Sequence, residues 1–410
     1  MKIKLQKSLI SGVKHHVNIT GSKSESNRLL LLQALYPEIS ISNLSNSDDS
    51  QVMQKALKSD SNTIDIHHAG TAMRFLTAFF ATQENRQIVL TGSSRMQERP
   101  IKILVDALKE LGADINYKNQ KGYPPILIKG KKLKKDAVDL AANVSSQYIS
   151  SLLLIAPRLS NGLKLNLNGK ITSVPYIKMT LALLHEIGVE TKFENNSIEV
   201  KPLKSFSQPI NLIVESDWSS ASYYYSIAAL SDVGTQIELS SYKKNSLQGD
   251  SVLASIYQEF GVKTTFKAHS ILLKKVNLDI KQKSLELDLA NAPDIAQTLA
   301  VTCLGLNVPC ILTGLHTLKI KETDRLVALK TEIEKFGTSV DITENALIIK
   351  KIKPLKLGVT IDTYNDHRMA MAFAPLALKI AITVNDSEVV SKSYPEFWTD
   401  LESIGFQIKK

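Results

Sequence analysis

The stretch NDHRMAMAFAPLAL, residues 365–378, decides the fold, because a charged triplet leads directly into an apolar run. Asp366, His367 and Arg368 come first, and the apolar residues 369–378 are typical of a buried helix. Charged groups at the mouth of a buried helix lose hydration and need partners. This stretch therefore predicts a helix whose N-terminal end meets a polar partner.

Five other stretches share this arrangement of polar residues followed by an apolar run. They are GSKSESNRLLLLQAL from residue 21, AGTAMRFLTAFFA from 69, VSSQYISSLLLIAP from 144, SDWSSASYYYSIAAL from 216 and APDIAQTLAVTCLG from 292. After the first pair, the starts recur roughly every 72 to 76 residues, a longer period than that of common solenoids. All six have their polar groups at the N-terminal end, where a helix carries unpaired N–H groups and a partial positive charge. Several such ends pointing into one cleft would bind an anionic ligand.

A second series of helices interleaves with the first. VMQKALKSDSNTIDI is its first member, and five further members each end at a glycine. These glycines, which accept the left-handed conformation just past a helix at low cost, are Gly112, Gly188, Gly261, Gly337 and Gly405. Alternating segments follow them, as expected of strands. Such alternation occurs in any α/β protein, but the polar groups at every buried helix start favour a true repeat. Six units predict an α/β protein with two similar domains of three units each.

Composition restricts the class of partner. The 410 residues carry a formal net charge of +10, which suits nucleic acid, a membrane surface or small phosphorylated or carboxylated molecules. The densest basic run, KGKKLKKD at 129–136, contains no aromatic residue and is typical of a solvated loop. No apolar run approaches about 18 residues, and the first residues lack a secretory apolar region. Cys303 and Cys310 have neither zinc nor disulfide spacing. We therefore expect a cytoplasmic protein with reduced, buried thiols.

Three charged motifs each fit either a binding site or an ordinary surface. GSKSESNR at 21–28 lacks the Walker A spacing and could be a helix cap with solvated charges. KETDR at 321–325 could be the first turn of a helix capped by Thr323. RMQERP at 95–100 could be a surface turn. Each motif taken alone leaves both interpretations open.

Together these motifs predict acid–base chemistry on anionic substrates. Arginine presents a planar fork that suits phosphate and carboxylate. The arginines in question are Arg74, Arg99, Arg325 and Arg368. Asp294 and Glu322 supply groups that can exchange protons. No Cys/His/Asp cluster has metal-ligand spacing and no GxGxxG follows a strand, so we expect neither a metal nor a cofactor.

Ten short motifs occur in one order between about residues 20 and 400. They are GSKSESNR, AGTAMRFLTA, RMQERP, SSQY, SVPY, SDWSSASY, LQGD, APDIA, KETDR and YNDHRMAMA. This series resembles the 5-enolpyruvylshikimate-3-phosphate synthase family. The resemblance implies an inside-out α/β barrel of two domains, each with three βαβαββ repeats, and an active site in the cleft between them. It places one domain at 20–216 and the other at 1–19 and 217–410.

The resemblance also implies a reaction. The family transfers the enolpyruvyl group of phosphoenolpyruvate to the 5-hydroxyl of shikimate 3-phosphate and releases phosphate, a step toward chorismate and the aromatic amino acids. A monomer without nucleic-acid or membrane partners is expected. Two alternatives remain: the related transferase acting on UDP-N-acetylglucosamine, which commonly uses a loop cysteine, and a non-catalytic polyanion binder.

By motif, the resemblance gives residue roles. Asp294 would be the general base, Glu322 the general acid, and Lys23 would stabilise developing charge. Shikimate 3-phosphate would contact Lys23, Ser24, Arg28, Ser145, Ser146, Gln147, Ser173, Asp294, Thr317 and Lys321. Phosphoenolpyruvate would contact Lys23, Gly70, Arg99, Gln147, Arg325, Arg368 and Lys392. Tyr176 would pack beside the first substrate, Arg74 would support the loop at Gly70, and His367 would orient its neighbours.

Several residues depart from the family pattern. His68 stands where the family often has Asn, Phe75 where Pro often follows the arginine, and Thr20 where Pro often precedes the glycine. Thr317 replaces an Asn of some members, and Trp218 is bulkier than the usual small residue. These departures bear on the shape of the phosphoenolpyruvate loop rather than on the reaction.

Overall fold

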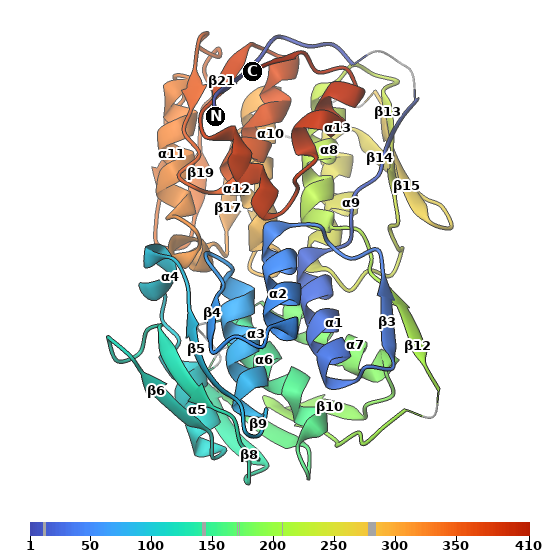
Figure 1. The fold of residues 1–410 in the computed structure, drawn as a ribbon. Helices are drawn as coiled ribbons and strands as arrows, with labels where there is room; N and C mark the ends of the chain where they lie inside the picture. Colours follow the sequence, from blue (N-terminus) through green and yellow to red (C-terminus); the bar gives the residue numbers. More distant parts are fainter. Residues whose placement is uncertain (11–13, 142–144, 170, 172, 207, 278–283) are drawn as a thin grey trace. The chain divides into compact units, whose positions relative to one another are not determined.

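The chain forms two compact units. The structure, a computed structural model, describes residues 1–10, 14–141, 145–169, 171, 173–206, 208–277 and 284–410. Unit 1 consists of Met1–Thr20 and Glu215–Lys410, and unit 2 of Gly21–Val214 (Figure 1). Unit 2 is therefore inserted into the sequence of unit 1. Across the described ranges, no helix has the length and apolarity that a membrane crossing requires.

Unit 2 contains three related groups of elements. The first group is α1 (Lys23–Leu35), β3 (Ile39–Ser42), α2 (Asp48–Lys58) and β12 (Ile210–Ile213). The second is β4 (Thr63–Asp65), α3 (Gly70–Ala81), β5 (Gln87–Thr91), α4 (Ser94–Gln97), α5 (Lys102–Glu110), β6 (Asp114–Tyr117) and β7 (Ile126–Lys129). The third is β8 (Ala137–Ala141), α6 (Ser146–Ile155), the 3-10 turn η1 (Ala156–Arg158), β9 (Leu163–Asn168), α7 (Val174–Glu186), β10 (Thr191–Glu194) and β11 (Ser197–Val200).

Two sheets of unit 2 share one strand order. The orders are β4-β5-β7-β6 and β8-β9-β11-β10, in which the first pair is parallel and the other pairs are antiparallel. A parallel pair needs a crossover connection, and the buried helices α3 and α6 provide it. Within the described residues, the sheet of the first group consists of the parallel pair β12 and β3.

Unit 1 repeats the same plan. Its first group is β2 (Lys14–Val17), α8 (Trp218–Leu230), β13 (Gln236–Ser240), η2 (Gly249–Val252), α9 (Leu253–Ile256), η3 (Tyr257–Phe260), β14 (Val262–Phe266) and β15 (Ser270–Lys275). The second is β16 (Leu285–Asp288), η4 (Pro293–Ile295), α10 (Ala296–Leu306), β17 (Cys310–Thr313), η5 (His316–Ile320), α11 (Arg325–Lys335), β18 (Asp341–Ile342) and β19 (Leu347–Ile349). The third is β20 (Thr360–Ile361), α12 (His367–Phe373), η6 (Ala374–Leu378), β21 (Ile382–Val384), η7 (Ser387–Lys392), α13 (Phe397–Ser403), β22 (Ile408–Lys409) and β1 (Ile3–Leu5).

The first residues of the chain complete two sheets of unit 1. The strand orders are β2-β13-β15-β14, β16-β17-β19-β18 and β20-β21-β1-β22, each with one parallel pair at the same end. β2 pairs in parallel with β13, more than 200 positions later in the sequence, and β1 lies between β21 and β22. The repeated order in both units confirms the predicted α/β fold class.

The predicted buried helices form the core of each unit. In unit 2, α1, α3 and α6 pack against one another, and in unit 1 α10 packs against both α8 and α12 (Figure 1). Most residues of these helices are buried, because a helix that is apolar all round has no face suited to water. One boundary differs from the prediction: α12 ends at Phe373 and continues as a 3-10 turn, since Pro375 cannot donate the next helical hydrogen bond.

The helices of the second series end as predicted. Gly112, Gly188, Gly261, Gly337 and Gly405 all have positive φ, between 71° and 110°. That conformation is strained for residues with a Cβ atom, and it lets the chain leave the helix toward the next strand. The glycine pattern therefore identified these helix ends correctly.

We predict that β1 contributes strongly to the stability of unit 1. Leu5 is fully buried at the centre of its sheet, so Leu5→Ala should lower the free energy of unfolding by about 2–5 kcal/mol. Lys4→Ala on the exposed face of the same strand is the control and should cost less than about 0.5 kcal/mol. Denaturant unfolding measures both, and equal costs would contradict the central place of this strand.

Candidate functional site

Arg325, the first residue of α11, holds three carboxylates in unit 1. Its side chain is 2% exposed. Nε donates to Asp366 at 2.7 Å, Nη1 to Asp294 at 2.9 Å and Nη2 to Glu322 at 2.8 Å. Burial alone would lower the pKa of Arg325, but the three carboxylates, Asp366 first, outweigh it and raise the pKa above its usual value. The predicted base and acid, Asp294 and Glu322, therefore meet on one cation.

A second arginine links Asp294 to the start of another buried helix. Arg368 Nη2 lies 3.3 Å from Asp294 Oδ2 and donates to Ser219 Oγ at 3.2 Å. Ser219 in turn donates to the buried carboxylate of Asp250. Burial, with the nearby Asp294 carboxylate next, raises the pKa of Asp250. The N-terminal ends of α8, α10 and α12 thus converge around Asp294.

The local sequence explains how α11 and α12 present these arginines. Asp366 caps α12 by accepting the backbone N–H of Arg368 at 2.9 Å. Asp324 caps α11 by accepting the N–H groups of Leu326 and Val327. The alternative in which Thr323 caps this helix does not hold, because the aspartate one position later accepts both N–H groups.

Three further predicted residues lie in unit 1. Lys321 Nζ is 3.5 Å from Asp294 Oδ1. Lys392, in η7, donates to the backbone oxygen of Asn365 at 2.6 Å, directly before the charged triplet. Thr317 lies in η5, half-buried. Lys321 and Lys392 add positive charge beside the two arginines.

In unit 2, the starts of α1 and α3 meet through a carboxylate. Lys23, the first residue of α1, has its Nζ 3.3 Å from Asp49 Oδ2. Asp49 Oδ1 lies 3.9 Å from Nε2 of His68, which stands two residues before Gly70, the first residue of α3. Asp49 is buried and comes from the first turn of α2. The starts of three helices therefore bring polar side chains together at this point.

Arg99 covers the start of α3. A Cβ placed on Gly70 would lie 2.6 Å from Arg99 Nη1 and 3.0 Å from Nη2, so the guanidinium rests on the glycine. Arg74 holds the backbone from below, donating to the oxygen of Gly70 at 3.2 Å and to that of Pro100 at 2.9 Å. The absence of a side chain at Gly70 thus lets a cation approach the helix start.

The start of α6 joins that of α3. Ser145 caps α6 by accepting the N–H of Gln147 at 3.3 Å, and Ser146 is the first helical residue. Gln147 Nε2 donates to Thr71 Oγ1 at 3.1 Å, which ties the two helix starts together. Ser173 directly precedes α7 and has a left-handed backbone, with φ at 53°. The polar starts of α1, α3 and α6 therefore converge in unit 2.

Arg28 is a buried cation whose hydrogen-bond partners are neutral. It is 3% exposed and donates to Thr180 Oγ1, Ser150 Oγ and the backbone oxygens of Ser24 and Tyr176. Burial lowers the pKa of Arg28 to about 10, and burial followed by the charge of Arg99 lowers that of Arg74 equally. Buried cations without a bonded carboxylate favour an anionic ligand.

The departures from the family pattern are accommodated locally. Phe75 is buried, with Arg28 lying 5.4 Å from the centre of its ring. Trp218 is also buried and donates through Nε1 to Glu215 at 2.8 Å. Its ring packs edge-on against Tyr242. Both large residues therefore form part of the core beneath the helix starts.

Sequence reasoning gave no role to Asp49, Asp250 or Ser219. Asp250 stood in the LQGD motif and Ser219 in SDWSSASY, so a signal existed for both. Asp49 lies in an ordinary acidic first turn, where a cap explains it equally well. Within the described residues, no group of three or more His, Cys, Asp or Glu side chains is arranged to hold a metal ion.

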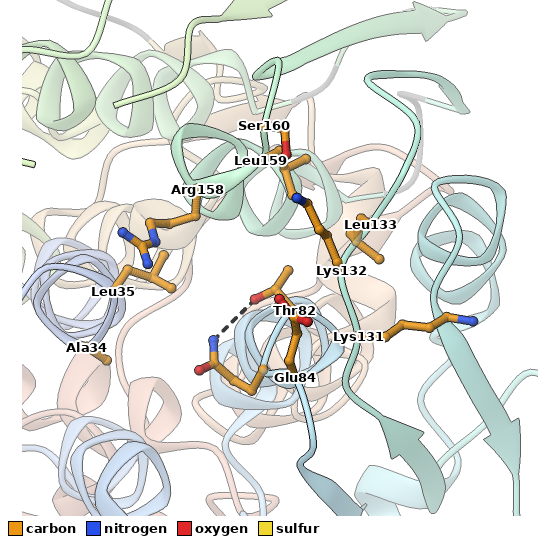
Figure 2. Close-up of a pocket in the computed structure, with 11 residues that line it drawn as sticks. Ala34, Leu35, Thr82, Glu84, Lys131, Lys132, Leu133, Arg158, Leu159 and Ser160 are labelled. Carbon is orange, nitrogen blue, oxygen red and sulfur yellow. Dashed lines mark hydrogen bonds between the residues drawn. The ribbon is translucent and has the colours of Figure 1, made fainter. Parts of the chain in front are cut away.

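A hollow of about 320 Å³ lies at the opposite ends of the unit 2 helices (Figure 2). It is lined by Ala34, Leu35, Thr82, Gln83, Glu84, Lys131, Lys132, Leu133, Arg158, Leu159 and Ser160. Arg158 and Lys132 flank the hollow. Lys132 and its neighbour Lys131 are exposed and belong to the basic run at 129–136, which was predicted to be a solvated loop. Cations there offset the partial negative charge at the C-terminal ends of α1, α3 and the α6–η1 helix. None of the predicted site residues lines this hollow. It lies at the C-terminal ends of the helices and is separate from the candidate site.

The fold belongs to a known class. The structure matches a solved EPSP synthase from Acinetobacter baumannii with a TM-score of 0.81 and 22% identity over 100% of both chains. It also matches the enolpyruvyl transferase NikO from Streptomyces tendae, with a TM-score of 0.75 and 14% identity over 100% of this chain and 98% of that one. The fold is therefore that of the enolpyruvyl transferases.

Sequence comparison narrows the class to one family. A 3-phosphoshikimate 1-carboxyvinyltransferase of Bacteroides fragilis is 46% identical over 405 residues, 97% of each chain. One of Haemophilus influenzae is 36% identical over 96% of this chain and 97% of its own. The profile of the family EPSP synthase (3-phosphoshikimate 1-carboxyvinyltransferase) matches residues 58–401. The chain belongs to this family.

We predict that Asp366 is essential to the stability of unit 1. It is fully buried against Arg325 and caps α12, so Asp366→Ala leaves a buried cation with fewer partners. The free energy of unfolding should fall by about 3–5 kcal/mol in a denaturant titration. Asp341→Ala, which breaks an exposed pair with Lys350, is the control and should cost less than about 1 kcal/mol.

Proposed function

We propose that this chain transfers the enolpyruvyl group of phosphoenolpyruvate to the 5-hydroxyl of shikimate 3-phosphate, with Asp294 as general base and Glu322 as general acid. The family to which the chain belongs carries this activity in its name. The observation that supports the residue roles is the contact of both carboxylates with Arg325. A base and an acid held on one cation can serve the two proton transfers of an addition–elimination reaction.

The substrates are anions, and the two units offer different partners for them. In unit 1, the phosphoenolpyruvate carboxylate would take hydrogen bonds from Arg325 in exchange for Asp294 or Glu322. That exchange would free a carboxylate for proton transfer. Arg368 and Lys392 would bind the same substrate, with Gly70, Arg99 and Gln147 contributing from unit 2. Cations aimed at the departing phosphate would stabilise its developing charge.

Shikimate 3-phosphate would bind mainly through unit 2. Arg28 and Lys23 supply positive charge, and the helix starts supply hydroxyl groups and N–H donors. The remaining residues proposed for this substrate are Ser24, Ser145, Ser146, Gln147, Ser173, Asp294, Thr317 and Lys321. We further propose that residues 20–216, and 1–19 with 217–410, act as the two domains of a cytoplasmic monomer.

Asp294→Asn and Glu322→Gln should each reduce turnover by roughly 10² to 10⁴, because a positioned general base or acid contributes about that factor. The assay is phosphate release with both substrates. Both variants should still bind the substrates, which calorimetry measures. Glu344→Gln, at an exposed pair with Lys319, is the control and should keep wild-type turnover. Near-normal turnover in either site variant removes that residue from the mechanism.

Two alternatives are tested by the same assay. Phosphate release that depends on UDP-N-acetylglucosamine would reject the choice of shikimate 3-phosphate. Both cysteines are buried in α10 and β17, a position unlike that of a loop cysteine. Absence of phosphate release with either acceptor, together with strongly salt-dependent binding to an oligonucleotide, would favour a polyanion binder.

Gly70→Ala should weaken phosphoenolpyruvate binding without unfolding the protein. The new methyl group would displace the far end of the flexible Arg99 side chain, which lies within 3 Å. We expect the KM for phosphoenolpyruvate to rise about ten-fold, equivalent to about 1.4 kcal/mol, with little change for shikimate 3-phosphate. In an Arg99→Lys background the same substitution should have a smaller effect. Equal effects in both backgrounds would show that Arg99 does not transmit the change.

A further inference from the structure

Helix α11 grips the segment that leads from β20 into α12 at two separate places. At its first residue, Arg325 binds Asp366. Two turns further along the helix, Glu332 binds the earlier part of the segment, accepting the backbone N–H of Asp362 at 3.1 Å. Lys335, one turn later, donates to Asp362 Oδ2 at 2.8 Å and to the backbone oxygen of Thr360 at 3.1 Å.

Glu332 uses both oxygens of its carboxylate. The residue is fully buried, where a carboxylate without hydrogen bonds would be costly. Oε2 bonds to Asp362 and lies 2.7 Å from Lys335 Nζ, while Oε1 accepts the Tyr364 hydroxyl at 2.6 Å. The hydrogen bond from the Tyr364 hydroxyl is short and has a charged acceptor, and such hydrogen bonds are stronger than those between neutral groups. Glu332 therefore holds the segment through its backbone and through the side chain of Tyr364.

The backbone between the contacts of Glu332 and Arg325 is strained. Tyr364 and Asn365 are both left-handed, each with φ at 54°. Asparagine tolerates this conformation, but a bulky residue such as tyrosine seldom adopts it. Strained backbone persists where its surroundings over-determine it. Here the hydroxyl of Tyr364 is anchored to α11, and Asp366 is anchored to the same helix two residues later.

This strained pair adjoins two of the residues proposed to bind phosphoenolpyruvate. Arg368 follows it within three residues, on the first turn of α12. Lys392 donates to the backbone oxygen of Asn365 itself, at 2.6 Å. A change in the left-handed turn would therefore shift Arg368 and displace the backbone acceptor of Lys392, while Asp294 and Lys321 sit on other elements.

We propose that Glu332 and Tyr364 are positioning residues for phosphoenolpyruvate, because their hydrogen bond fixes the turn that aims Arg368 and Lys392. This inference rests on the proposed function of the site. Neither residue touches the substrate in this proposal. Their effect is on the binding of one anion, and it reaches the substrate through the backbone at 364–365.

The test is Tyr364→Phe, which removes the hydroxyl and keeps the ring. We expect the KM for phosphoenolpyruvate to rise roughly three- to ten-fold, which is part of the free energy of one hydrogen bond to a charged group, because this bond acts on the substrate only through the backbone. kcat and the KM for shikimate 3-phosphate should stay within about two-fold, since uniform binding of one substrate is lost. Glu332→Gln should shift the same constant in the same direction. Tyr123→Phe, at a half-buried tyrosine of unit 2, is the matched control and should change neither constant.

The outcomes separate this inference from the proposed function. An unchanged KM for phosphoenolpyruvate in Tyr364→Phe overturns the inference, whether or not Glu332→Gln folds. Equal weakening of both substrates also overturns it, because a general structural defect would do that. If the wild type releases no phosphate, the proposed function fails. Calorimetric affinity for phosphoenolpyruvate then decides the inference, and equal affinity in wild type and Tyr364→Phe rejects it.

Discussion

The structure depends on one constraint: a helix buried on every side can present polar groups to a ligand only at its ends. The N-terminal end also carries unpaired N–H groups and a partial positive charge, so it is the end that suits an anion. In unit 2 the starts of α1, α3 and α6 converge, and in unit 1 those of α8, α10 and α12 do. The core that stabilises each unit therefore also brings the polar helix starts of that unit together.

The two units satisfy their charges in different ways. In unit 1, Arg325 is surrounded by carboxylates that raise its pKa, so the cation is already paired. In unit 2, Arg28 and Arg74 bond to neutral groups, and burial lowers the pKa of each to about 10. Within the described residues, Arg28 and Arg74 make no ion pair with a carboxylate, whereas Lys23 lies 3.3 Å from Asp49. An anion arriving at Arg325 must exchange with the groups proposed for acid–base work. Binding and proton transfer would thereby be linked through one side chain.

Much of the fold followed from local patterns in the sequence. The buried helices were predicted from their apolar runs, and the glycines with positive φ marked the ends of the second series. The errors were also local. Asp324, rather than Thr323, caps α11, because two acceptors one position apart compete for the same N–H groups. Pro375 ended α12 early, at Phe373, although the apolar run continues.

The candidate site divides in the same way. The site residues were proposed in advance from the order of motifs that resembles a known family, because the local pattern of each motif alone left its role open. The partners of these residues could not be predicted. Asp250 pairs with Ser219 and Asp49 with Lys23, and the loops between them follow no periodic sequence pattern. The hydrogen bond between Glu332 and Tyr364 could not be predicted from the sequence, because a glutamate inside an amphipathic helix is ordinarily solvated.

The sequence by itself determined which segments form the buried helices, that five elements of the second series end at glycines, and that the buried helices start with polar groups suited to anions. Those properties depend on neighbours three or four residues away, which the sequence displays directly. Only the tertiary structure decided which carboxylate each cation meets, and that β1 completes a sheet with β21 and β22. The strand pairings join residues hundreds of positions apart, and most of the ion pairs join separate elements. Both are set by strand order and packing rather than by any local period.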